Sequence, residues 1–307
     1  MNGALSFILS GALVAATPLL IAALGELVAE KSGVLNLGIE GMMAIGAVIA
    51  FITVHQQGSH WLALLTAGLA GLALSMVFAV LVLQFLANQV AAGISLGLLG
   101  LGLSAFVGRR FESLTVEPMA KIHLPVLSDL PLVGPLVFGQ SPPVYLAPLV
   151  GLAIWWFLRS TKAGLVVRAV GETPEAAHAL GYSVVAVRYA TIAFGGFMAG
   201  IAGGYMSTVY SNLWADGMIA GRGWIVVALV VFGTWRVGRI AAGAYLFGIT
   251  AILELSLQSL GVAVPSQLLA SLPYLVTIIA LALLSMEERR VRLNAPVALG
   301  QVYRAEH

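Results

Sequence analysis

The strongest constraint on the fold is a run from Gly41 to Gly108 that contains no aspartate, glutamate, lysine or arginine. A helix needs about 20 apolar residues to cross the hydrocarbon core of a bilayer, so this run predicts three membrane spans, with short breaks near His55–His60 and Ala87–Gln89. Only 9% of the 307 residues are charged and 60% are hydrophobic, whereas soluble domains carry about 25% charged residues. The sequence therefore predicts an all-α polytopic membrane protein.

Other apolar runs predict further spans. Met1–Gly25 is uncharged and too long for a signal-peptide core, and the later spans are expected at Val144–Leu158, Tyr189–Tyr210, Gly217–Trp235, Ile240–Leu260 and Leu268–Met286. The total is about nine transmembrane helices, within a range of about 8 to 10. Gly217–Trp235 is the weakest span, because Arg222 leaves an uncharged stretch that rises only about 20 Å in a helix. We expect it to be tilted, broken or re-entrant.

The positive residues predict the orientation. If the N-terminus lies outside, the outer side holds only Arg109, Arg110, Lys121 and Arg222, and the inner side holds the other eleven: Lys31, Arg159, Lys162, Arg168, Arg188, Arg236, Arg239, Arg289, Arg290, Arg292 and Arg304. Because lysine and arginine are enriched in cytoplasmic loops, we expect the N-terminus outside and the C-terminus in the cytoplasm. Residues 1–286 then form a single transmembrane domain with an external loop at about 109–143 and a cytoplasmic loop at about 159–188, followed by a cytoplasmic tail at 287–307.

The composition also excludes several classes of protein. The chain has no cysteine, so it forms no disulfide, thiolate zinc site or iron–sulfur cluster. Its five histidines are scattered, without the spacing of a metal site, and a net charge of +2 is too small for a nucleic-acid surface. We expect no metal, no cofactor bound by this chain and no nucleic-acid partner. Membrane lipid is an expected partner of the spans.

Small residues recur every fourth position in three of the predicted spans. The sets are Gly196, Gly200 and Gly204; Gly93 and Gly97; and Ala67, Gly71, Ser75 and Ala79. This spacing lets helix backbones approach closely inside a membrane. The pattern predicts helix–helix contacts within one chain.

The longest predicted inner loop contains a helix signal. Thr173 is a good N-cap, Pro174 suits the first helical position, Glu175 lies in the first turn, and Gly181 is placed as a C-terminal stop. A helix of about two turns is marginal alone in water. We therefore expect it to lean on the neighbouring spans or on a partner protein.

The sequence Glu175-Ala176-Ala177, followed after three residues by Gly181, resembles the EAA-x3-G pattern of permease subunits in bacterial ABC importers. Arg168–Gly181, GELVAEKSGVLNLGIEGMMAIGA at 25–47 and GRGWIVVALVVFGTW at 221–235 resemble the branch that serves ribose, branched-chain amino acids and nucleosides. The resemblance runs from about residue 5 to 286 and is closest to the shorter permease of nucleoside importers that use a basic-membrane-protein-type lipoprotein. The I-x-L-P ending of the fuller pattern is absent, which favours the sugar and nucleoside branch.

The resemblance implies a type II ABC importer-like permease in the bacterial inner membrane, which forms the path for a small polar solute: a nucleoside, or a purine or simple sugar. The partners it implies are ATP-binding subunits that hold ATP and Mg²⁺, a second homologous permease or a second copy of this chain, and an extracytoplasmic solute-binding lipoprotein. The residues it assigns to coupling with the ATPase are Gly171, Glu172, Thr173, Pro174, Glu175, Ala176, Ala177 and Gly181.

The chain itself has no site for ATP hydrolysis. A phosphate-binding loop needs Gly-Lys followed by Ser or Thr, and the three lysines, Lys31, Lys121 and Lys162, follow Glu, Ala and Thr. We therefore expect a transport subunit that is not an enzyme by itself.

Polar residues inside spans are candidates for the solute path, because each is costly in lipid and usually faces the bundle interior. The candidates are Asn36, Glu40, Glu254 and Gln258. Glu26 lies nearer a predicted span end, where an interfacial role is expected. The alternative is an ion-coupled secondary transporter in which Glu40 and Glu254 carry the ion.

Overall fold

The computed structural model describes residues 2–122, 139–259 and 294–304, with isolated helical positions between 268 and 280. The side chains of residues 2–7, 255, 258 and 259 are outside that description. Within the described residues the chain is a bundle of helices, and its only β interaction is an isolated bridge between Thr115 and Leu213.

Seven of the described helices are long and apolar enough to cross a membrane. They are α1 (Asn2–Lys31), α2 (Ile39–Gln57), α3 (His60–Leu83), α4 (Gln89–Gly108), α6 (Pro142–Ser160), α9 (Val184–Tyr205) and α11 (Val237–Ser259). The shorter elements are η1 (Arg109–Phe111), α7 (Lys162–Glu172), α8 (Pro174–Ala179), the π-helix η2 (Met206–Tyr210) and α10 (Arg222–Phe232). An all-helical polytopic membrane fold is thereby confirmed.

The breaks between the early spans lie where the sequence placed them, since α2 ends at Gln57 and α3 begins at His60. The first span differs from its prediction, because α1 continues past Gly25 to Lys31. The predicted span Leu268–Met286 lies almost entirely outside the described residues, so the total of nine and the orientation stay predictions.

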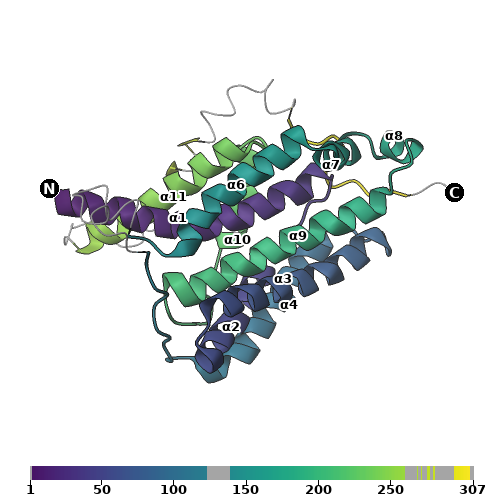
Figure 1. Cartoon of the computed structure of the whole chain (residues 1–307). Helices are drawn as coiled ribbons and strands as arrows, with labels where there is room; N and C mark the ends of the chain where they lie inside the picture. The colour runs from purple at the N-terminus through teal and green to yellow at the C-terminus, as the bar shows by residue number, and fades with distance from the viewer. Residues whose placement is uncertain are drawn as a thin grey trace.

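The bundle has two distinct ends (Figure 1). The chain begins at one end, whereas α7, α8 and the C-terminal residues lie together at the other. We call the latter the α8 end. Lys31, the last residue of α1, lies at this end, because its side chain donates a hydrogen bond to the Asn294 carbonyl at 2.8 Å.

The predicted small-residue contacts are confirmed around α9, which packs against α1, α2 and α3. The backbones are so close that a Cβ atom on Gly200 would collide with the Ala67 carbonyl of α3, and one on Gly203 with the Met43 carbonyl of α2. On α4, a Cβ atom on Gly93 would lie 2.8 Å from the Leu37 backbone nitrogen. We call the contacts of Gly196, Gly200 and Gly203 the glycine seam.

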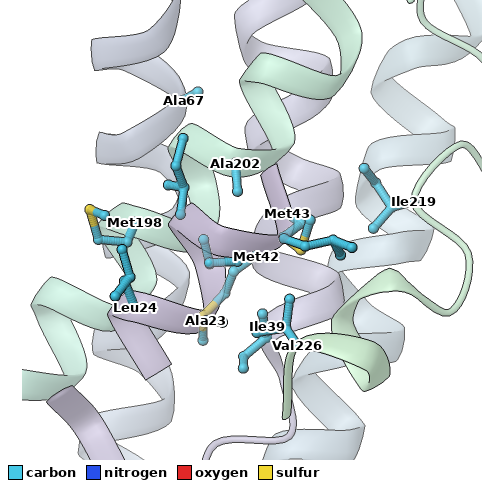
Figure 2. Packing of buried hydrophobic residues seen from close by; sticks show 14 of the residues in the cluster. Ala23, Leu24, Ile39, Met42, Met43, Ala67, Met198, Ala202, Ile219 and Val226 are labelled. Atoms are coloured by element: carbon cyan, nitrogen blue, oxygen red, sulfur yellow. The ribbon is translucent and has the colours of Figure 1, made fainter. Parts of the chain in front are cut away.

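An apolar core fills the space beside this seam. Figure 2 shows side chains from α1, α2, α3, α9 and α10 meeting there, among them Leu24, Met42, Met198 and Val226. Met42 and Val226 are both fully buried. Close van der Waals packing of this kind holds helices together where lipid is as apolar as the protein.

The predicted span 217–235 is broken. Asn212 lies near the C-terminal end of α4, where its carbonyl accepts a hydrogen bond from the Val116 N–H at 3.0 Å. The chain then runs without long helix to α10, whose 11 residues rise about 16 Å. Trp235 reaches the α8 end, where its indole N–H donates to Glu30 of α1. The irregular segment 212–221 and the short helix α10 therefore traverse the bundle together.

Candidate functional site

A second break separates α1 from α2 and is fastened by Asn36. The Asn36 N–H donates to the Glu26 carboxylate at 3.1 Å, and its side-chain oxygen accepts from the Gly38 N–H at 2.9 Å. Its side chain is 1% exposed. Asn36 therefore holds the shape of this break.

Glu40 joins the two breaks. It lies in the first turn of α2, and its Oε1 accepts a hydrogen bond from the Gly221 N–H at 2.8 Å, at the N-terminus of α10. A carboxylate is favourable there because helix N-termini carry partial positive charge. Gly223 packs so closely on Glu40 that an added Cβ atom would collide with the Glu40 side chain. The other oxygen, Oε2, is buried without a hydrogen-bond partner among the described residues.

Two further acids are buried: Glu26, for which the sequence analysis wrongly expected an interfacial role, and Glu30, which it did not single out. Glu26 and Glu30 on α1 are 1% and 0% exposed, and they bind Asn36 and Trp235 respectively. Their spacing of four residues places them on one helix face, which is the signal that could have found them. We call Glu26, Glu30, Asn36, Glu40 and Trp235 the polar network, because they tie α1, both breaks, α2 and α10 together.

The remaining path candidates lie elsewhere. Glu254 is half-buried near the end of α11, and Ile252 in the same stretch contacts Gly11, close to the start of α1. Glu40 instead contacts α10. These contacts therefore place Glu40 and Glu254 in different regions of the bundle. Gln258 belongs to α11, but its side chain lies outside the described residues.

The predicted coupling helix is present as α8. Pro174 occupies its first turn, and Gly181 follows its end with a φ of +88°, a conformation that glycine adopts readily. Thr173 occupies the N-cap position, but its side chain makes no capping hydrogen bond. Its carbonyl instead accepts from the Ala177 N–H at 3.1 Å.

One face of α8 is anchored and the other is free. Pro174 and Ala177 are buried, whereas Glu175 and Ala176 are exposed. Leu180, directly after the helix, is 76% exposed. Glu175, Ala176 and Leu180 therefore leave one side of α8 uncovered at the surface of the bundle. The sequence analysis did not single out Leu180.

Two of the predicted coupling residues lie on α7, a helix that was not predicted. Gly171 is buried, and a Cβ atom on it would collide with the Lys31 carbonyl, whereas Glu172 is exposed. The Thr161 side chain caps α7 by accepting from the Gly164 N–H at 3.0 Å. The predicted set therefore divides into three buried residues and five exposed ones. The buried residues are Gly171, Pro174 and Ala177, and the exposed ones are Glu172, Thr173, Glu175, Ala176 and Gly181.

Residues 8–284 match the family described as branched-chain amino acid transport system / permease component. "Putative glucose ABC transporter permease protein TsgC13" of Haloferax volcanii is 40% identical over 97% of this chain and 98% of its own length. Guanosine ABC transporter permease protein NupQ of Bacillus subtilis is 34% identical (90% and 91%), and nucleoside ABC transporter permease protein NupC of Lactococcus lactis is 33% identical (91% and 92%). No solved structure matches the chain significantly. The chain is therefore a permease subunit of an ABC importer and belongs to the branched-chain amino acid transport system permease component family.

Proposed function

We propose that this subunit forms the translocation path for a nucleoside, with purines and simple sugars as the related solutes. The names of NupQ and NupC, which specify guanosine and nucleoside, support this substrate class, and that of TsgC13 supports a sugar. The subunit is a multi-pass protein of the inner membrane. Such permease components lack an ATPase site, so the energy for transport comes from ATP-binding subunits.

The exposed face of α8 is the observation that supports coupling between this subunit and an ATPase subunit. The helix lies at one end of the bundle, outside the long helices (Figure 1). Its buried residues, Pro174 and Ala177, fix it to the bundle, while Glu175 and Leu180 remain free. This surface would dock on an ATPase subunit that holds ATP and Mg²⁺. The complete importer would add a second permease, homologous or identical, and an extracytoplasmic solute-binding lipoprotein.

The polar network supports ATP-driven rather than ion-driven transport. Glu26, Glu30 and Glu40 each accept a hydrogen bond from another segment of the chain, so they hold breaks and helix ends together. An uncharged solute needs hydrogen-bonding groups rather than ion pairs along its path. Asn36 and Glu40 lie at the junction of the two breaks, and selectivity would be set first by the lipoprotein.

Reconstituted uptake tests this function. Proteoliposomes containing the permease, its ATP-binding subunits and its lipoprotein should accumulate labelled guanosine or glucose only when ATP is present. Thermal-shift measurements on the lipoprotein with both solutes should identify the preferred one, because a ligand stabilises the protein that binds it. Accumulation driven by a proton or sodium gradient, without nucleotide, would show that the ion-coupled alternative is correct.

Glu175→Lys tests the role of α8 directly. The variant reverses the charge on the exposed face, so uptake should fall at least about tenfold, as unfavourable charge placement at an interface costs several kcal/mol. Membrane insertion should be unchanged, because Glu175 is exposed. Glu112→Lys, which changes an exposed acid at the other end of the bundle, is the matched control. Uptake by Glu175→Lys at the control rate would contradict the docking assignment.

A further inference from the structure

The C-terminal residues 294–304 lie against the α8 end of the bundle, and we call them the C-terminal strap. The Ala298 N–H donates to the Gly171 carbonyl at 2.9 Å, and the Gly300 N–H donates to the Gly33 carbonyl at 3.1 Å. Ala298 is 3% exposed. Since Gly171 lies near the end of α7 and Gly33 lies in the break before α2, the strap joins the coupling region to that break.

Side chains from three other helices hold the strap. Lys31 of α1 donates to the Asn294 carbonyl. The Gln301 carbonyl accepts from Gln89 of α4 and from Arg188 of α9, both at 3.3 Å. Backbone carbonyls of the strap thus accept hydrogen bonds from side chains of three separate helices. The strap is therefore fixed to the bundle.

Tyr303 connects the strap to α8 itself. Its ring centroid lies 6.4 Å from that of His178 on α8, in an edge-on arrangement, and the Arg188 guanidinium lies 5.9 Å from its centroid. Arg188 is 1% exposed and also donates through Nε to the Ser32 carbonyl at 3.1 Å. The Tyr303 ring therefore lies beside α8 and beside Arg188. Arg188 in turn holds Ser32, the first residue of the break before α2.

We propose that the C-terminal strap transmits the movement of α8 to the break before α2, with Tyr303 as the positioning residue. The proposal rests on the proposed function, because it needs an ATPase that moves α8. Helix α8 packs on α7 and α9, and α7 also reaches the break, because a Cβ atom on Gly171 would lie 3.2 Å from the Gly33 nitrogen. The strap adds a second link, from Tyr303 beside α8 to the Gly33 carbonyl. From there the chain continues to Asn36 and Glu40, which contact α1 and α10.

The test compares three variants in the reconstituted importer, with labelled guanosine and glucose supplied in parallel. Tyr303→Ala removes the ring, Tyr303→Phe keeps it, and Val302→Ala changes a neighbouring strap residue that is 44% exposed. Two quantities are measured: the amount of ATPase subunit that co-purifies with the permease, and the solute imported per ATP hydrolysed. Tyr303→Ala should lower the second about tenfold, the size of a typical coupling between linked sites, and leave the first unchanged.

The other variants and outcomes decide between transmission and simple support. Tyr303→Phe and Val302→Ala should import as much solute per ATP as the wild type. If Tyr303→Ala assembles normally and keeps the wild-type ratio, or if it fails to retain the ATPase, the strap does not transmit and the proposal is wrong. A wild-type importer without ATP-dependent uptake would overturn the proposed function as well, which separates the two failures.

Discussion

The contact between α3 and α9 and the contacts among α1, α2 and α10 are built from opposite kinds of residue. In the glycine seam, Gly196 and Gly200 bring two backbones together without intervening side chains. In the polar network, buried carboxylates reach across chain breaks to single N–H donors, as Glu30 does to Trp235 and Glu40 to Gly221. The first contact depends on shape along a whole helix, and the second on a few directed bonds.

This difference indicates which part of the bundle can move. Sliding α9 along α3 would drive backbone atoms into one another, because interiors are close-packed. The polar network instead ends on a strained turn after α10, since Thr234 and Trp235 there both have positive φ values, of 50° and 51°, which are costly for residues with side chains. We therefore expect the path to open at the break before α2 and at α10, while α9 and the two helices that its glycines contact, α2 and α3, form the rigid frame.

The largest expected effect tests the rigid frame. Gly200→Leu places a side chain against the Ala67 carbonyl, so the free energy of unfolding should fall by more than about 3 kcal/mol, beyond the usual cost of overpacking. Thermal unfolding of purified protein in detergent measures it. Gly102→Leu is the control, because an added Cβ atom there has open space. Equal stability of the two variants would mean that α3 and α9 separate easily.

A smaller effect is expected in the polar network. Trp235→Phe removes the indole N–H and leaves the fully buried Glu30 carboxylate without that donor. Stability should fall by about 1–3 kcal/mol, the cost of an unsatisfied buried polar group. Trp156→Phe, at a position that is 58% exposed, should have little effect in the same unfolding measurement. A loss as large as that of Gly200→Leu would contradict the distinction between the two contacts.

Local patterns in the sequence were sufficient for the glycine seam and for α8. Gly196 and Gly200 are four residues apart and so share a helix face, and Pro174 and Gly181 mark the limits of a helix by their own backbone preferences. Hydrophobic runs likewise predicted α2, α3 and α4. These features depend on residues that are close together in the chain, so one sequence is enough to read them.

The polar network and the strap could not be predicted in the same way. Glu30 meets Trp235, and Gly171 meets Ala298, across long stretches of chain, and neither residue carries a local signal of its partner. Helix α1 extends past Gly25 because Glu26 and Glu30 find donors on other segments, which a rule based on uncharged runs excludes. Long-range pairing of this kind decides how the breaks are held.

The smallest expected effect concerns Glu40. In the polar network this acid holds α10 to α2, whereas in the ion-coupled alternative its charge would carry the ion. Glu40→Gln keeps an oxygen that can accept from the Gly221 N–H but loses the charge at the N-terminus of α10, so stability should fall by about 1 kcal/mol or less. ATP-dependent uptake should then stay within about fivefold of the wild type, as this energy permits, and Glu117→Gln, an exposed acid, serves as control. Complete loss of uptake with normal folding would mean that the Glu40 charge itself acts in transport, and that this acid does more than hold α10 to α2.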